Sequence, residues 1–276
     1  GAVYALVALG FTLIYNASGV VNFAQGEFVM LGGMLTVFAA GAGLPLAGAA
    51  LLAVILTAGV GVALNKLAVE PARGASVVAL IIITIGASIF LRGAAGVIFG
   101  KDIHRFPAFT GEDPLSVGGA TILPQSLWII FGAACIFVGL WAFFNRTLVG
   151  KAVLATANNR LAAKLVGINT DAMMTLSFGL SAAVGAMAGV LATPITLTRF
   201  DVGVALALKG FAAAMLGGMG APQGALVGGL LLGLIEALTA GYISSAYKDA
   251  AAFVVILFVL MAMPQGLFGR SAQERV

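Results

Sequence analysis

Few side chains in this sequence could carry out chemistry by themselves. The one histidine, His104, and the one cysteine, Cys135, lack partners at the spacing of a metal site, and a single cysteine excludes an internal disulfide. The serines and acids form no nucleophile motif, and no Gly-x-x-x-x-Gly-Lys-Ser/Thr phosphate loop occurs. We therefore expect a protein that is not an enzyme and has no catalytic residues, metal site or cofactor. The chemistry to be expected is recognition by its polar segments.

The composition indicates a membrane protein in which these polar segments separate long apolar ones. Of 276 residues, 61% are hydrophobic and only 9% are charged, whereas a soluble domain carries about a quarter charged residues. The apolar runs are continuous rather than alternating, which favours membrane helices over a barrel. The 38 glycines suit helices that pack closely in a membrane. The net charge of +4 is small, so we expect a lipid bilayer and no nucleic acid as partner.

These patterns predict an all-α polytopic membrane protein, organised as one domain over residues 1–276, with about nine transmembrane segments and broken helices. The expected apolar segments are 1–15, 27–42, 46–64, 77–99, 125–144, 172–193, 210–216, 225–240 and 249–263. Residues 194–209 are expected to be a loop that runs into helix. The first run is short for a span of about 20 residues, so we expect further residues ahead of it. No cleavable signal peptide is expected.

The longest polar break, residues 145–171, holds four basic residues and one acid. They are Arg146, Lys151, Arg160, Lys164 and Asp171. Apolar residues recur in this break at helical spacing, which predicts a short helix beneath the membrane that presses on a soluble partner. The alternative is a solvated connector whose charges only set the orientation. Asn169 or Thr170 is expected to cap the following helix.

The distribution of basic residues predicts the orientation. If the basic break lies in the cytoplasm, alternation places residues 65–76 and the C-terminal tail there too, and residues 100–124 outside. The inner loops then carry Lys66, Arg73, Arg146, Lys151, Arg160, Lys164, Arg270 and Arg275, and the outer loops carry Lys101, Arg105, Arg199 and Lys248. This excess favours a cytoplasmic C-terminus.

Two features of the apolar regions bear on a pathway. In the break at residues 16–25, NASGVVNFAQ, Asn22 and Gln25 could hydrogen-bond a substrate or a neighbouring helix, or form an ordinary turn. The sequence MLGGM occurs at residues 30–34 and again at 215–219, which is either a trace of an inverted repeat or chance.

Four charges lie in or against the apolar runs: Glu27, Arg92, Lys209 and Glu236. Charges in a membrane usually face a cavity or an interface. Glu27 could interact with a helix dipole or serve transport. Arg92 and Glu236 are expected to reach toward the membrane surface near span ends, and Lys209 is ambiguous.

Five segments of the chain resemble LivH-type permeases, the membrane subunits of branched-chain amino-acid ATP-binding-cassette importers. The segments are GAVYALVALGFTLIYNASGVVNFAQGEFVMLGG, TIGASIFL, ANNRLAAKLVGINTD, LKGFAAAMLGGMGAPQGALVGGLLLGLIEAL and YKDAAAFVVILFVLMAMPQGLFGR. They extend in order from Gly1 to about Arg270. The family normally has further residues before Gly1, which leaves the first span in doubt.

This resemblance implies a permease subunit in a bacterial-type inner membrane. It would work with a second permease subunit, related or identical, two cytoplasmic ATPase subunits and an extracytoplasmic substrate-binding protein. Residues 157–167 would form the coupling helix of the cytoplasmic loop 145–171, with Asn158, Arg160, Lys164 and Gly167 contacting the ATPase. We expect the translocation pathway to involve Asn22, Gln25, Gly32, Gly33, Gly217 and Gly218.

Three alternatives remain open at this point. One is a urea or short-amide importer permease of the same superfamily, and another is a sugar or nucleoside importer permease. The third is an ion-coupled secondary carrier, although few acids or histidines lie mid-span, where a proton-coupled carrier would need them.

Overall fold

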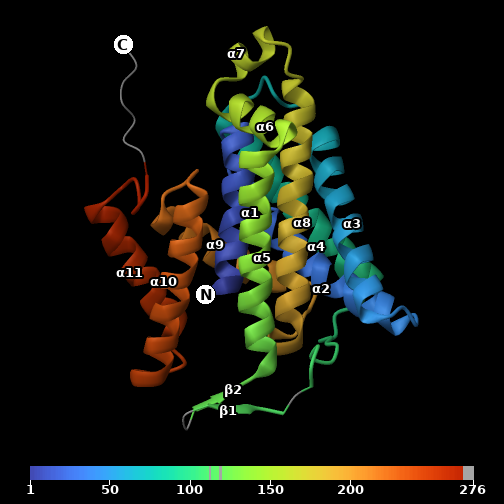
Figure 1. Cartoon of the computed structure of the whole chain (residues 1–276), viewed down its shortest axis with the longest axis vertical. Coiled ribbons are helices and arrows are strands. Elements are labelled where there is room, and N and C mark those ends of the chain that lie inside the picture. The colour runs from blue at the N-terminus through green and yellow to red at the C-terminus, as the bar shows by residue number, and fades with distance from the viewer. Residues whose placement is uncertain (112, 118–119, 270–276) are drawn as a thin grey trace.

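The computed structural model describes residues 1–111, 113–117 and 120–269, and Figure 1 shows an elongated helical bundle. Arg270 and Arg275, which entered the predicted orientation, lie outside the described residues. The helices are α1 (Ala2–Ser18), α2 (Gln25–Gly41), α3 (Leu46–Leu64), η1 (Asn65–Val69), α4 (Val77–Ile98), α5 (Pro124–Arg146), α6 (Leu148–Asn158), α7 (Arg160–Leu165), α8 (Thr170–Thr196), α9 (Val202–Gly217), α10 (Pro222–Tyr242) and α11 (Lys248–Ala262).

Five helical segments among the described residues are long and apolar enough to cross a membrane. They are Leu46–Val69, Val77–Ile98, Pro124–Arg146, Thr170–Thr196 and Pro222–Tyr242, and α1 and α9 are shorter apolar helices. A mainly helical fold with membrane-spanning helices is therefore confirmed, whereas nine spans stay a prediction. The first MLGGM copy lies within α2, and the second extends from the end of α9 into the following turn, so the inverted repeat also stays a prediction.

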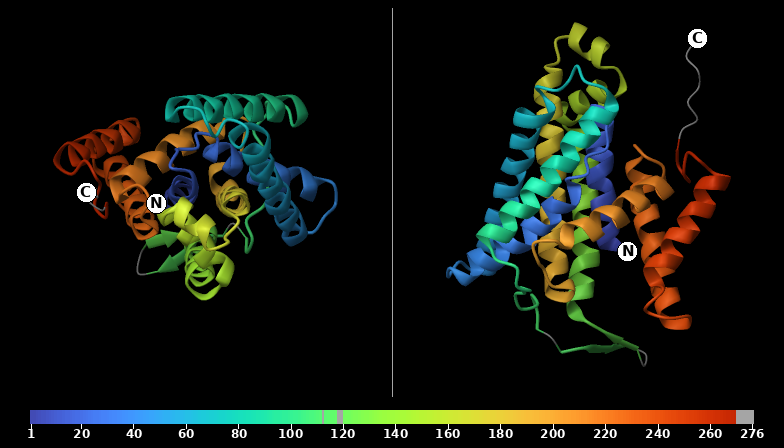
Figure 2. Two further views of the ribbon diagram at one scale, coloured as in Figure 1. Left: turned by 90° about the horizontal axis from the view of Figure 1, so that it is seen from above. Right: turned by 180° about the vertical axis from the view of Figure 1, so that it is seen from behind.

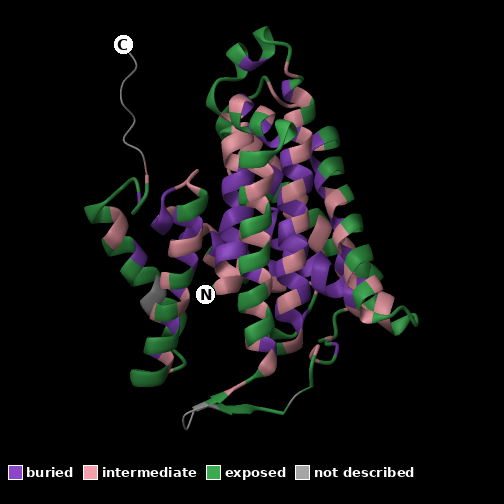
Figure 3. Cartoon of the chain, in the orientation of Figure 1, coloured by how far each residue is buried: buried purple, intermediate pink, exposed green. Residues whose placement is uncertain are grey.

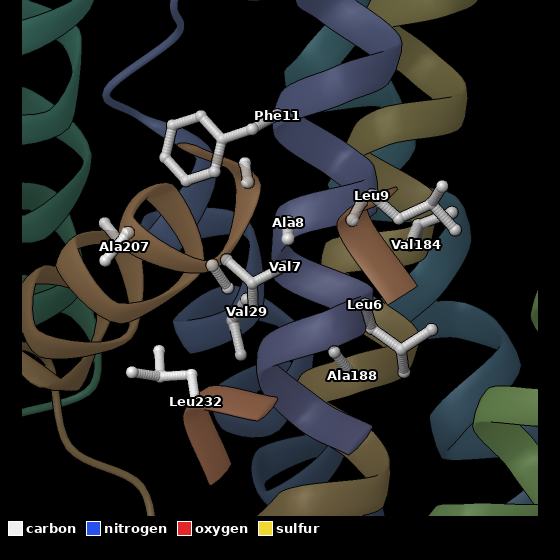
Figure 4. Close-up of a cluster of buried hydrophobic side chains, with 14 of the residues drawn as sticks. Leu6, Val7, Ala8, Leu9, Phe11, Val29, Val184, Ala188, Ala207 and Leu232 are labelled. Carbon is white, nitrogen blue, oxygen red and sulfur yellow. The ribbon is translucent and has the colours of Figure 1, made fainter. Parts of the chain in front are cut away.

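The centre of the bundle is built from α1, α2 and α8, and α4 and α5 are peripheral (Figure 3). In the most apolar window of α8, 67% of residues are buried, against 6% for α4 and α5. Small residues permit this packing: a Cβ added to Gly189 of α8 would lie 2.0 Å from the Val29 carbonyl oxygen of α2. Figure 4 shows how Leu6, Val7 and Phe11 of α1 fill the space between α8 and α9.

Several helix boundaries differ from the sequence predictions. The helix expected to end at residue 193 continues through Pro194 to Thr196, so the loop before α9 is shorter than expected. Membrane helices tolerate proline more readily than soluble ones, and α8 continues through Pro194 without a break.

The expected outer loop also contains structure. It includes the antiparallel strands β1 (Leu115–Val117) and β2 (Ala120–Ile122), at the opposite end of the bundle from α7 (Figure 1). His104 and Thr198 exchange two backbone hydrogen bonds of 2.9 Å, which join this loop to the α8–α9 connection. We call this end of the molecule the hairpin end.

Candidate coupling surface and translocation pathway

The basic break forms two helices rather than the one short helix that was expected. Each begins with a side-chain cap: Thr147 Oγ1 accepts from Gly150 N at 2.9 Å, and Asn159 Oδ1 accepts from Ala162 N at 2.9 Å. The bend between α6 and α7 therefore follows from Asn159, which caps α7 with an extended backbone. Asn169 caps α8 by accepting from Ala172 N at 3.0 Å, which confirms one of the two predicted caps.

The helix α7 projects from the end of the bundle, as Figure 1 shows. Leu161, Leu165 and Val166 are 71%, 80% and 77% exposed, and within α7 only Ala163 is buried. Gly167 follows with φ +87°, a left-handed conformation that glycine adopts without strain. Three exposed apolar side chains on a capped helix form a surface that a partner could cover. We call Arg160–Gly167 the coupling surface.

The structure brings the predicted coupling residues together at this end. Asn158, Arg160, Lys164 and Gly167 are all exposed. Arg160 turns back toward the bundle, where its Nη2 lies 2.7 Å from Asp171 Oδ1. Asp171 also binds Arg73, from the turn before α4, so one carboxylate joins three parts of the chain. Sequence reasoning missed this contact, because Arg73 and Asp171 are 98 positions apart. The one available signal was that Asp171 is the single acid among the basic residues of the break.

The two predicted pathway amides lie at the interior break between α1 and α2. Asn22 is buried, and its Oδ1 accepts from Ala24 N at 3.1 Å. Gln25 bridges two helices: its Oε1 accepts from Ser181 Oγ at 2.6 Å, and its Nε2 donates to the Ser181 carbonyl at 3.3 Å. A Cβ at Gly10 would lie 1.9 Å from Gln25 Nε2, so glycine leaves room for this amide. Gln25 therefore hydrogen-bonds a neighbouring helix, which is one of the uses considered for it, and its role in a pathway stays a prediction.

The four predicted pathway glycines lie where helices or turns approach closely. An added Cβ would meet the Ala186 carbonyl oxygen at 2.2 Å from Gly32, Thr193 Oγ1 at 2.4 Å from Gly33, and the Gly224 carbonyl oxygen at 1.9 Å from Gly217. Gly218 has φ +101° and lies against Gly269. Their role in lining a pathway stays a prediction.

The membrane charges form two groups. Lys209 Nζ lies 2.7 Å from Glu236 Oε1 and 2.8 Å from Asp249 Oδ1, and Tyr4 OH donates to Glu236 Oε2 at 2.6 Å. We call these four residues the lysine cluster. Glu236 is only 8% exposed, so the expectation that it reaches the membrane surface is wrong. Its carboxylate contacts Tyr4 of α1 and Lys209 of α9 inside the bundle.

Glu27 belongs to the second group, with Ser88 and Arg92 of α4. Ser88 Oγ donates to Glu27 Oε1 at 2.8 Å. Glu27 lies in the first turn of α2, where a carboxylate suits the helix dipole, but its side chain does not cap that helix.

Together, the fold and these sites define a polytopic helical membrane protein with an exposed apolar helix at one end and charges inside its bundle. A solved structure with a similar fold, PsaBC from Streptococcus pneumoniae in complex with Fab, matches with a TM-score of 0.53 and 15% identity. The match covers 97% of this chain and 90% of that one.

The sequence comparisons identify the family. Residues 1–261 match the family described as branched-chain amino acid transport system / permease component, and the chain belongs to it. It is 33% identical to the high-affinity branched-chain amino acid transport system permease protein LivH of Salmonella typhimurium, over all of this chain and 94% of the relative. It is also 33% identical to the permease protein BraD of Pseudomonas aeruginosa, with the same coverage.

Proposed function

We propose that the chain is the permease subunit of an ATP-binding-cassette importer that moves branched-chain or other hydrophobic amino acids across a bacterial inner membrane. The full-length similarity to permeases named for branched-chain amino acids carries this proposal. Those names favour branched-chain amino acids over urea or short amides as substrate. ATP hydrolysis would belong to two cytoplasmic partner subunits, and an extracytoplasmic binding protein would deliver the substrate to this chain and a second permease subunit.

The coupling surface supports the assignment of an ATPase partner. A groove in the ATPase could cover Leu161, Leu165 and Val166, while Asn158 and Lys164 offer polar contacts at the rim. Arg160 and Asp171 would pass a displacement of α7 to the start of α8 and, through Arg73, to the turn before α4. In this orientation the α7 end lies in the cytoplasm, and the hairpin end faces the binding protein.

The proposal is tested by purifying the tagged chain in mild detergent from its own membranes and identifying the accompanying proteins by mass spectrometry. A Walker-type ATPase and a second permease should co-purify. The complex is then placed in proteoliposomes with its binding protein, and ATP-dependent uptake of leucine, isoleucine, valine and urea is measured. Uptake of urea alone would favour the short-amide importer. Uptake that needs an ion gradient and no ATP would overturn the proposal in favour of a secondary carrier.

Replacing Gly167 tests the coupling surface within this complex. Gly167→Val places a β-branched residue at φ +87°, which costs roughly 1–2 kcal/mol and distorts the end of α7. We expect leucine uptake to fall severalfold while the protein inserts normally. Gly74→Val is the matched control, because an added Cβ there meets nothing within 4 Å and no positive φ is required. Unchanged uptake by Gly167→Val at normal expression would remove this role.

A further inference from the structure

A hollow of about 210 Å³ opens between α4, α9 and the break that precedes α2. The right view of Figure 2 shows α4 and α9 on the same side of the bundle. Most of the wall is apolar, formed by Phe23, Ile85, Ile89, Val204, Ala207 and Leu208. The two polar residues in the wall, Ser88 and Arg92, are four positions apart and therefore share one face of α4. The hollow combines an aliphatic wall with one polar stripe.

A buried carboxylate stands directly behind this stripe. Glu27 is 1% exposed, and its Oε1 accepts the hydroxyl proton of Ser88 at 2.8 Å. Its other oxygen, Oε2, has no hydrogen-bond partner among the residues that the structure describes. Gly203 of α9 leaves space for it, because a Cβ there would lie 2.5 Å from Oε2. Oε2 therefore retains the capacity to accept a hydrogen bond.

Arg92 forms no ion pair within the described part of the chain, in contrast to Lys209. An arginine within a membrane helix that faced lipid would be costly. Arg92 instead lines the hollow together with Ser88. In the proposed importer, the second permease subunit would cover this side and exclude lipid.

This hollow has a neighbour on the side of the hairpin end. A second hollow, of about 540 Å³, shares Val204 and Leu208 with the first and extends to Arg199 and Asp201. These two residues form an exposed pair, with Arg199 Nε 2.6 Å from Asp201 Oδ1. Val204 and Leu208 of α9 are therefore a wall common to the two hollows.

We propose that the hollow at Ser88 and Arg92 binds the transported amino acid as a zwitterion, an inference that rests on the proposed function. Arg92 donates hydrogen bonds to the α-carboxylate. Ser88 Oγ, whose proton is held by Glu27, accepts from the α-ammonium group, and the negative charge of Glu27 attracts that group. Ile85, Ile89, Val204 and Leu208 surround the aliphatic side chain. The site then recognises both charged groups of an amino acid and an apolar side chain between α4 and α9.

Thiol labelling tests occupancy without relying on transport. The native cysteine is first removed by Cys135→Ser, and Ile89→Cys then places a single thiol in the hollow. Val97→Cys is the control, because Val97 lies on the same helix and is 87% exposed. The complex with its ATPase and second permease subunits is labelled in nanodiscs with a methanethiosulfonate reagent. Leucine should slow labelling at position 89 but not at 97. Leucinamide and 4-methylpentanoate, which each lack one charge of the zwitterion, should protect less. Equal labelling with and without leucine would overturn the inference.

Measurements of leucine uptake by variants distinguish a failure of this binding site from a failure of the proposed importer function. Loss of hydrogen bonds to a charged group should lower leucine uptake by Arg92→Ala roughly ten- to hundredfold, with partial recovery in Arg92→Lys. Arg105→Ala, at an exposed arginine of the outer loop, is the control. Normal uptake by Arg92→Ala would overturn the site and leave the importer standing, whereas no ATP-dependent leucine uptake by the wild-type complex would overturn the importer. If Arg92→Ala fails to retain its ATPase, the labelling result decides.

Discussion

The lysine cluster and the group at Glu27 both place charges inside a membrane bundle, but they differ in how completely those charges are paired. Lys209 Nζ contacts oxygens of Glu236, Asp249 and Tyr4 within 3.2 Å. Glu27 keeps one bond, to Ser88, and Arg92 forms no ion pair among the described residues. A fully paired cluster can fasten helices, whereas an incompletely paired one retains capacity for a ligand. We therefore expect the completeness of pairing, rather than burial, to distinguish charges that hold helices together from charges that bind a ligand in this fold.

The largest effect is expected at Lys209. Lys209→Ala leaves Glu236 buried without its cation, which should lower the free energy of unfolding by about 3–5 kcal/mol. The loss is measured by detergent-induced unfolding, and also as less protein in the membrane. Lys248→Ala, at an exposed lysine beside the same carboxylate Asp249, is the control. A loss no greater than in the control would mean that the lysine cluster does not fasten α9 to α10 and α11.

Removing the charges of both Lys209 and Glu236 tests whether the destabilisation comes from leaving Glu236 unpaired. Lys209→Met combined with Glu236→Gln removes the unpaired charge and keeps a polar group near Tyr4 OH. Since replacing a buried ion pair is often nearly neutral, the double variant should recover most of the stability, to within about 1–2 kcal/mol of wild type. A double variant as unstable as Lys209→Ala would show that the charges matter beyond their mutual pairing.

Filling the space beside Glu27 should give an intermediate effect. Gly203→Ala would place a Cβ 2.5 Å from Glu27 Oε2 and 2.8 Å from the Gly26 carbonyl oxygen. Such overpacking costs about 1–3 kcal/mol of unfolding free energy. Gly86→Ala of α4 is the control, because an added Cβ there meets nothing within 4 Å. Equal stability of the two variants would indicate that α2 and α9 can separate without cost.

The smallest effect on stability is expected at Glu27. Glu27→Gln keeps an acceptor for Ser88 and removes a charge whose second oxygen is unpaired, so the free energy of unfolding should change by less than about 1 kcal/mol. Leucine uptake should nevertheless fall, because the ammonium group loses its counter-charge. A destabilisation as large as that of Lys209→Ala would erase the distinction between the two groups.

Much of the helix pattern was predictable from local signals. The bounds of α3, 46–64, follow from Pro45 before an unbroken apolar run and from the polar residues after it. The end of α9 at Gly217 lies one residue beyond the expected end at 216, whereas α10 begins at Pro222, three residues before the expected start at 225. The continuation of α8 through Pro194 was missed, because a proline in the sequence usually indicates a helix end, whereas a membrane helix can continue through one.

The contacts that define the sites could not be predicted in this way. Tyr4 and Glu236 are 232 positions apart, and no local pattern places them together. The glycines at residues 32, 33 and 217 were recognisable as unusual, but composition cannot distinguish a glycine that opens a pathway from one that admits a neighbouring backbone. For Glu27 and Arg92 the sequence indicated the cost of burial and left the partner open.

The close contact between α2 and α8 has a consequence for motion. Gly32 and Gly189 bring backbone against backbone, so these helices have no side-chain layer on which to slide and should move as one rigid body. By contrast, α4 has only Thr84 and Ala95 buried, and hydrogen bonds from Thr84 and Ser88 hold it to the α1–α2 break and to α2. We therefore expect alternating access to be a tilt of α4 against a fixed α1–α2–α8 unit, with its hinge at these two hydroxyl groups.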